Sequence, residues 1–127
     1  MEKIVEEMLH NVIESKTYDE ELLLAYFSTD YIQVVDGNTL DFTGFKRHIQ
    51  KLKELIATVE VEVLNFASRG HTVFTKHQVQ SVLRDGSHHK HIVMAEFTFH
   101  KDKIVRCEEL TFLLKGTASG KNLGSTV

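Results

Sequence analysis

The chain has 127 residues, of which 42% are apolar and 26% are charged, and its formal net charge is -3. This length fits one domain, and the apolar content excludes an intrinsically disordered chain. Basic and acidic residues are mixed without a long run of one sign, so we expect neither a nucleic-acid partner nor a membrane partner.

The single cysteine and the N-terminal residues bear on the compartment. Cys107 cannot form a disulfide within the chain, and it fits a reducing environment. The first residues, MEKIVEEM, are charged and differ from a signal peptide, and the longest apolar run, LLLAYF, is too short to cross a bilayer. The sequence therefore predicts a soluble cytoplasmic protein.

The first half of the chain predicts mainly helices. Apolar periodicity indicates two amphipathic helices, a short strand and a third helix, at residues 4–13, 17–27, 31–35 and 45–56. A capping box between Thr17 and Glu20 starts the second helix. The turn formed by Asp36, Gly37 and Asn38 ends the short strand.

The second half of the chain predicts strands, because the apolar period becomes two residues. Four long strands are expected at residues 59–63, 71–83, 88–99 and 104–114. The pairs Asp85-Gly86 and Lys101-Asp102 predict tight turns between them. Helices followed by hairpins predict one α+β domain over residues 1–115, with helices covering one face of an antiparallel sheet. Residues 116–127 are small and polar and predict a flexible tail.

Three stretches, LLLAYFSTDYIQVVDG, TGFKRHI and EFTFHKDKIVRCEELTFLL, resemble in this order the nuclear-transport-factor-like (NTF2-like) superfamily. Within it, they are similar to the SnoaL-like group of polyketide cyclases and ketosteroid isomerases. The resemblance covers residues 1–114. It implies a curved sheet wrapped around helices into a cone, with an apolar cavity at the open end and commonly a homodimer.

The resemblance does not extend to the isomerase residues. The ketosteroid isomerases of this group use an aspartate base, with a tyrosine and a protonated aspartate as oxyanion donors. The base matches Val35 or Asp36, so Asp36 is its counterpart only if the turn shifts by one residue. The tyrosine falls near His10 or Asn11 and the second aspartate at Ala95, so steroid isomerisation is not supported.

One face of the predicted sheet has the character of a pocket wall. A two-residue turn after Arg84 predicts that His91 lies opposite Gln80, and simple pairing adds alternate residues of the last strand. The ligand-binding candidates on this face are Gln78, Gln80, Arg106, Phe97 and Phe112. A bulge would exchange the two faces. In the alternative interpretation, Arg106 pairs with Glu108 structurally and the glutamines face water.

Asp36, His91 and Glu108 are the catalytic candidates for proton transfer. A histidine titrates near neutral pH, and an apolar cavity raises the pKa of a carboxylate toward working pH. The alternative for Asp36 is a turn residue whose side chain accepts from the next amides. His89 and His91 would point the same way, but two ligands are too few for a metal, so neither a metal nor another cofactor is expected.

Two functions remain open on the sequence. The resemblance implies a small-molecule-binding protein that is a cofactor-free isomerase, cyclase or hydratase for a small apolar substrate. The alternative is a non-catalytic ligand-binding or dimerisation module. In both cases we expect a two-fold homodimer through the second face of the sheet, to which simple pairing assigns Val73, Thr75, His77, Val79, Ile92, Met94 and Glu96.

Overall fold

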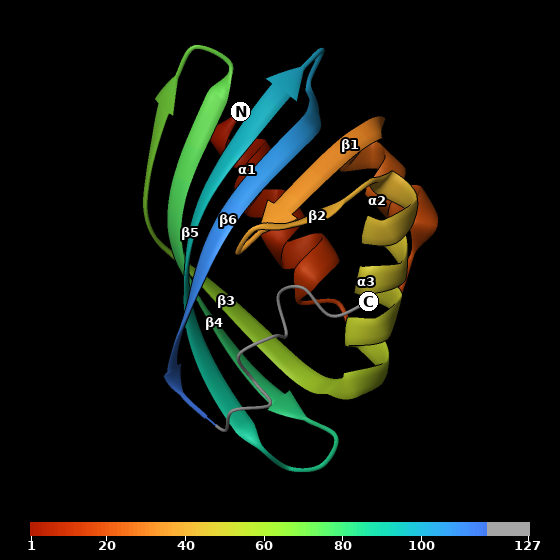
Figure 1. The fold of residues 1–127 in the computed structure, drawn as a ribbon, viewed down its shortest axis with the longest axis vertical. Coiled ribbons are helices and arrows are strands. Elements are labelled where there is room, and N and C mark those ends of the chain that lie inside the picture. Colours follow the sequence, from red (N-terminus) through yellow and green to blue (C-terminus); the bar gives the residue numbers. More distant parts are fainter. Residues whose placement is uncertain (117–127) are drawn as a thin grey trace.

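The chain begins with helices and continues into long strands (Figure 1). The helices are α1 (Glu2–Met8), its π-helical continuation η1 (Leu9–Ile13), α2 (Glu20–Tyr26) and α3 (Phe42–Leu55). The strands are β1 (Phe27–Val35), β2 (Asn38–Leu40), β3 (Ile56–Arg69), β4 (Thr72–Leu83), β5 (His88–His100) and β6 (Lys103–Lys115). The computed structural model describes residues 1–116, so the predicted flexible tail lies outside the described residues except for Gly116.

The strands form one curved sheet in the order β2-β1-β6-β5-β4-β3. Figure 1 shows this sheet bending around the helices, which confirms the predicted α+β cone. Neighbouring strands are antiparallel except for β1 and β6, which are parallel. The prediction of an antiparallel sheet is therefore corrected at this pair. No hairpin joins β1 to β6, so no tight turn dictates their relative direction.

Bulges contribute to the curvature of the long strands. The pairing of β3 with β4 shifts between Ile56 and Thr58 and again between Val63 and Asn65. A residue inserted into one strand of an antiparallel pair bends that strand and increases its twist. The sheet can therefore wrap around the helices and enclose a volume, which a flat sheet cannot do.

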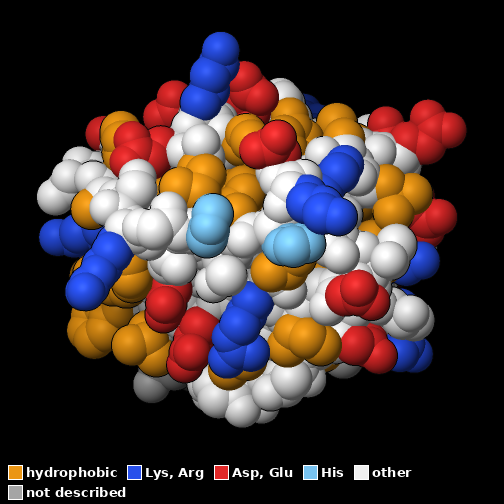
Figure 2. Space-filling view, turned by 90° about the horizontal axis from the view of Figure 1, so that it is seen from above, with side chains coloured by type: hydrophobic (Ala, Val, Ile, Leu, Met, Phe, Trp, Pro, Cys, Tyr) orange, Lys and Arg blue, Asp and Glu red, His pale blue; other side chains and the backbone are white. Residues whose placement is uncertain are grey.

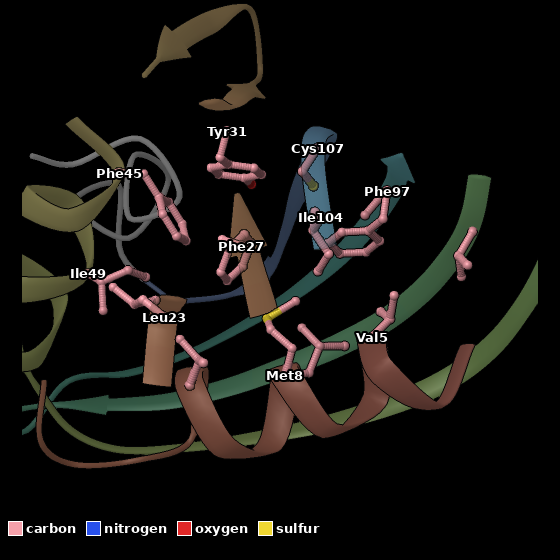
Figure 3. Packing of buried hydrophobic residues seen from close by; sticks show 14 of the residues in the cluster. Val5, Met8, Leu23, Phe27, Tyr31, Phe45, Ile49, Phe97, Ile104 and Cys107 are labelled. Carbon is pink, nitrogen blue, oxygen red and sulfur yellow. The ribbon is translucent and has the colours of Figure 1, made fainter. Parts of the chain in front are cut away.

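The hydrophobic core fills much of the space between the concave face and the helices (Figure 3). Phe27, Tyr31 and Phe45 form an aromatic cluster whose ring centroids lie 4.7 to 4.8 Å apart. Figure 3 shows Val5 and Met8 of α1 pointing toward side chains of the sheet. Burying each large apolar side chain of this kind contributes about 1.5–3 kcal/mol to stability. The core therefore holds the sheet in its bent form.

The helix caps differ from those predicted. Asp19 caps α2 by accepting a hydrogen bond from the amide of Leu22 at 3.3 Å, so the predicted cap at Thr17 is wrong. Asp41 caps α3 in the same way, through the amide of Gly44 at 2.7 Å. An aspartate is at least as good an N-cap as a threonine, and its position delays the start of α2 until residue 20.

The described surface mixes polar and apolar side chains. Figure 2 shows acidic and basic side chains interspersed with hydrophobic ones at the end of the molecule seen from above. None of the helices within residues 1–116 is both long enough and apolar enough to span a membrane.

Lys53 of α3 fastens this helix to the end of η1. Its ammonium group donates to the carbonyl oxygens of Val12 at 2.7 Å and Ile13 at 3.0 Å, and also to that of Ser15. Carbonyl groups at the end of a helix lack intrahelical partners. Burial lowers the pKa of Lys53 to about 8, so the side chain is still mainly charged at neutral pH. Lys53 therefore satisfies several carbonyl groups and joins two helices.

We predict that Lys53→Met lowers the free energy of unfolding by about 2 kcal/mol, because hydrogen bonds from a charged donor are lost and the carbonyl groups stay partly buried. Urea unfolding measures this change. Lys51→Met on the same helix is the control, since Lys51 makes only an exposed ion pair with Glu54 at 3.8 Å, which is worth at most about 1 kcal/mol. Equal losses in the two variants would contradict the role given to Lys53.

Candidate functional site

A cavity of about 140 Å³ lies between the concave face of the sheet and the helices. Its walls are mostly apolar and come from the first helix, α3 and the strands. Polar side chains also line it, namely Glu14, Ser15, Lys16, Tyr31, Gln33, His48, Lys53, Thr58, His77, Ser81, His91, Glu109 and Thr111. An apolar hollow with a few polar groups is the usual form of a small-molecule site.

The β4–β5 hairpin decides which residues of β4 face this cavity. The amide of Leu83 donates to the carbonyl of Ser87 at 2.9 Å, so the loop has three residues and Gly86 adopts φ +89°. His91 therefore lies opposite Val79, and the predicted pairing of His91 with Gln80 is wrong by one residue. Three-residue hairpin loops commonly place glycine at such a left-handed position. The shift turns Gln78 and Gln80 away from the cavity, so their predicted place on its wall is also wrong.

A bulge in β6 has the same effect on the last strand. Phe99 pairs with Ile104 but Thr98 pairs with Arg106, which leaves Val105 as an extra residue. Beyond it, Cys107, Glu109 and Thr111 share the cavity side of the sheet with Phe97, which lies opposite Cys107. The prediction that Arg106, Glu108 and Phe112 share this face is therefore wrong, because one inserted residue reverses the alternation.

The predicted site residues thus fall into two groups. His91 and Phe97 are buried and line the cavity, as expected. The outer face or the strand ends hold Asp36, Gln78, Gln80, Arg106, Glu108 and Phe112. Arg106 and Glu108 lie 3.6 Å apart and are each about half exposed, which confirms the alternative interpretation of a structural ion pair.

Asp36 connects two strands outside the cavity. It lies in the turn after β1 with φ 49°, and its carboxylate accepts from the amide of Thr111 at 2.8 Å and from the hydroxyl group of the same residue. The backbone amide of Asp36 also donates to the carbonyl of Glu109 at 3.0 Å. These bonds replace the predicted ones to the following turn amides, and they hold the end of β1 against β6.

Two carboxyl groups line the cavity, Glu14 and Glu109. Burial acts to raise the pKa of Glu14, but hydrogen bonds from the amide of Val61 at 2.7 Å and with His10 at 2.8 Å outweigh it and lower that pKa.

Burial raises the pKa of Glu109 above its ordinary value, and the nearby charge of Asp36 acts in the same direction, while a hydrogen bond from the Cys107 thiol at 3.3 Å opposes the rise. Burial also raises the pKa of Cys107 well above its ordinary value, so its thiol stays protonated. The sequence signal for Glu109 was the pair Glu108-Glu109, because adjacent strand residues face opposite sides and one of the two must point inward.

Tyr31 and Gln33 of β1 form a buried polar pair beside this carboxyl group. The hydroxyl of Tyr31 donates to Oε1 of Gln33 at 2.9 Å. Burial raises the pKa of Tyr31 well above its ordinary value, and the neighbouring Cys107 and Glu109 add to the rise. The Tyr31 hydroxyl is bonded to the amide oxygen of Gln33. The NH₂ group of the same amide is the end of the Gln33 side chain that can donate a hydrogen bond.

His77 is a neutral histidine in the wall of the cavity. Its Nδ1 lies 2.9 Å from the Thr75 hydroxyl, and burial lowers its pKa to about 4. When Thr75 donates to Nδ1, the other ring nitrogen of His77 carries the hydrogen and is a donor. The site thus combines a carboxyl group with raised pKa and uncharged hydrogen-bond donors.

The histidines of β5 do not form a metal site. The rings of His89 and His91 lie 6.5 Å apart between centroids. Within residues 1–116, no group of three or more histidine, cysteine, aspartate or glutamate side chains is arranged to hold a metal ion.

Sequence comparison finds a relative in Schizosaccharomyces pombe. No protein-family model matches the sequence. The chain is 28% identical over 107 residues to C11D3.04c of Schizosaccharomyces pombe, an uncharacterised protein, and the match covers 84% of this chain and 82% of the yeast protein.

Solved structures show the fold. An NTF2-like protein of unknown function from Exiguobacterium has a TM-score of 0.73 and 16% identity, covering 86% of this chain and 98% of its own. IdmH of Streptomyces antibioticus, a candidate polyketide cyclase, has a TM-score of 0.73 and 12% identity, covering 87% and 90%. An LEH-like epoxide hydrolase of Mycobacterium tuberculosis has a TM-score of 0.72 and 13% identity, covering 87% and 80%. The chain therefore has the NTF2-like cone fold that these proteins share.

Proposed function

We propose that the protein binds a small apolar molecule in the cavity and catalyses a cofactor-free proton transfer, as an isomerase, cyclase or hydratase. The observation that carries this proposal is the carboxyl group of Glu109, which lines an apolar cavity and has a raised pKa. A carboxylate with a raised pKa is a stronger base than one in water, and it exchanges protons closer to neutral pH.

Hydrogen-bond donors near Glu109 can stabilise the negative charge that forms in such a reaction. Removal of a proton next to a carbonyl or epoxide group places negative charge on an oxygen atom, which hydrogen-bond donors in a dry site stabilise. The amide group of Gln33 and a ring nitrogen of His77 are uncharged donors in the same cavity wall. In this mechanism Glu109 accepts the proton and returns it to a second atom of the ligand.

Solved structures with the same fold support the choice of reaction class. Two of them are named as a candidate polyketide cyclase and an epoxide hydrolase. Their identity to this chain is 12 to 13%, so they support the kind of cavity and not the substrate.

The alternative function, a binding or dimerisation module, is favoured by the outer face of the sheet. The exposed apolar side chains of this face are Phe74, Met94, Leu110, Phe112 and Leu114. We propose that this face forms the two-fold homodimer, because the ion pair of Arg106 and Glu108 gives it charges of both signs that can meet their opposites in a second copy. The face differs from the one expected, since the register shift places Val73, Thr75, His77 and Val79 on the concave side.

We predict that the protein accelerates the ring opening of 5-nitrobenzisoxazole, a small apolar carbon acid. A base removes the proton on carbon 3, the N–O bond breaks, and the phenolate product is read by its absorbance. Glu109→Gln should lower kcat/KM about 100-fold or more, in the usual range for a general base. The activity of the unaltered protein should rise with pH through a pKa above 4.5, since Glu109 must be ionised.

Glu108→Gln is the matched control for this experiment. Glu108 is the neighbour of Glu109 on the same strand, but it lies on the outer face in the ion pair with Arg106. Its replacement should leave the rate unchanged. A rate that survives Glu109→Gln, or that is lost in Glu108→Gln, would assign the base elsewhere.

We predict that His77 makes the protein less stable as the pH falls from 6.5 to 4. The unfolded chain binds a proton at the ordinary pKa near 6.5, whereas folded His77 binds it only near 4. Protonation therefore favours the unfolded state in this window, by up to about 3 kcal/mol, and His77 contributes no pH dependence above it. Urea unfolding at several pH values should show a smaller decline for His77→Gln. His88→Gln, at an exposed position of β5, should keep the full decline.

We predict that the protein is a dimer at micromolar concentration and that Phe112→Asp makes it a monomer. Phe112 is 66% exposed on the outer face of β6, so a charge there would be buried without a partner on association. Light scattering measures the mass. Leu24→Asp is the control, because Leu24 is exposed on α2, away from the outer face of the sheet. A monomeric unaltered protein would remove the dimer proposal.

A further inference from the structure

Thr75 and His77 form a buried hydrogen-bonded pair on β4. They are two residues apart and therefore lie on the same face of the strand, and they are only 5% and 3% exposed. The hydroxyl oxygen of Thr75 lies 2.9 Å from Nδ1 of His77, and His77 lines the cavity. Whatever decides which ring nitrogen carries the hydrogen therefore also decides what His77 offers to a bound molecule.

The surroundings of this pair are apolar. Thr75 lies opposite Phe66 on β3 and Ala95 on β5, and the residues opposite His77 are valines on both neighbouring strands. Within residues 1–116, the hydroxyl group of Thr75 has no hydrogen-bond partner other than His77. Among these residues, Nδ1 of that ring is therefore the acceptor for the hydroxyl hydrogen.

The positions of the hydrogen atoms follow from this arrangement. Burial lowers the pKa of His77 to about 4, so at neutral pH the imidazole is uncharged and has one N–H donor and one bare nitrogen. A hydrogen on Nδ1 would be donated to the Thr75 oxygen and would leave the hydroxyl hydrogen buried without an acceptor, which is unfavourable. With Thr75 as the donor, the hydroxyl hydrogen and Nδ1 are both satisfied, and the ring hydrogen lies on Nε2.

We propose that Thr75 is a positioning residue that fixes the tautomer of His77, so that Nε2 presents a hydrogen-bond donor to the cavity. The wall at His77 then selects ligands with an acceptor at this point, such as a carbonyl, ether or phenolate oxygen. A ligand group that can only donate would bring two hydrogens against each other. This inference deepens the proposed function, because it explains why His77 is a donor before the ligand arrives.

The tautomer can be measured without any ligand. Two-bond ¹H–¹⁵N NMR spectra of the labelled protein at neutral pH distinguish a protonated from a bare ring nitrogen, and His77→Gln identifies the signals of His77. We expect a protonated Nε2 and a bare Nδ1. Thr75→Val keeps the shape of the side chain but removes the donor, so both tautomers should appear, whereas Thr75→Ser should keep the single one. Thr72→Val, on the opposite face of β4, is the matched control and should change nothing.

The same variants test the consequence for the reaction. With 5-nitrobenzisoxazole, Thr75→Val should lower kcat/KM about tenfold, which is less than the roughly 10²–10³-fold loss expected when a donor to the developing charge is removed outright. Thr75→Ser should recover the activity, because its hydroxyl group can make the same bond. Thr72→Val should have the activity of the unaltered protein.

The outcomes separate this inference from the proton-transfer proposal. A protonated Nδ1 in the unaltered protein, or a single Nε2–H tautomer that persists in Thr75→Val, would overturn the role of Thr75 and leave Glu109 as the base. A mixed tautomer in Thr75→Val with undiminished activity would overturn the part that concerns the ligand. A fixed tautomer in an unaltered protein without activity would overturn the proposed function and leave the effect of Thr75 on His77 standing.

Discussion

The register of two hairpins decides what the interior of this protein contains. Side chains alternate along a strand, so one inserted residue exchanges the inner and outer sets for the rest of that strand. The three-residue loop before β5 and the extra Val105 in β6 each do this once. Together they bring His77, Ser81, Cys107 and Glu109 to the concave side. The chemistry of the cavity is thus a consequence of backbone geometry at two turns.

The bent sheet and the helices pack against each other around one hydrophobic core. Apolar residues of α1, α3 and the strands form a core that keeps the sheet curved, and the hollow that remains is bordered by both apolar and polar side chains. Asp36 fixes the end of β1 to β6 through Thr111, and its negative charge also helps to raise the pKa of Glu109. Asp36, an exposed turn residue, therefore both holds β1 against β6 and contributes to the raised pKa of Glu109.

Periodicity predicted the helices, the long strands and their α+β arrangement, since these depend on the spacing of apolar residues averaged over many positions. The cone was implied by the resemblance to the NTF2-like superfamily. The face of each strand could not be predicted in the same way. Gln78, Gln80, Arg106 and Glu108 were assigned to the cavity by counting from idealised two-residue turns, and a single-residue difference reverses that count. His91 and Phe97 were assigned correctly because β5 was the strand from which the faces were defined. One residue of the pair Glu108-Glu109 had to face the cavity. Which of the two does so depends on the bulge at Val105.

The extra Val105 also bears on how such proteins diversify. Moving one insertion along β6 would leave strand order and overall dimensions intact while exchanging the inward and outward side chains of the residues between its old and new positions. Descendants of one ancestor could in this way acquire unrelated substrates through an insertion and a compensating deletion, without passing through a series of point substitutions. Aligned sequences would then match well in their apolar spacing and poorly in the residues that perform chemistry.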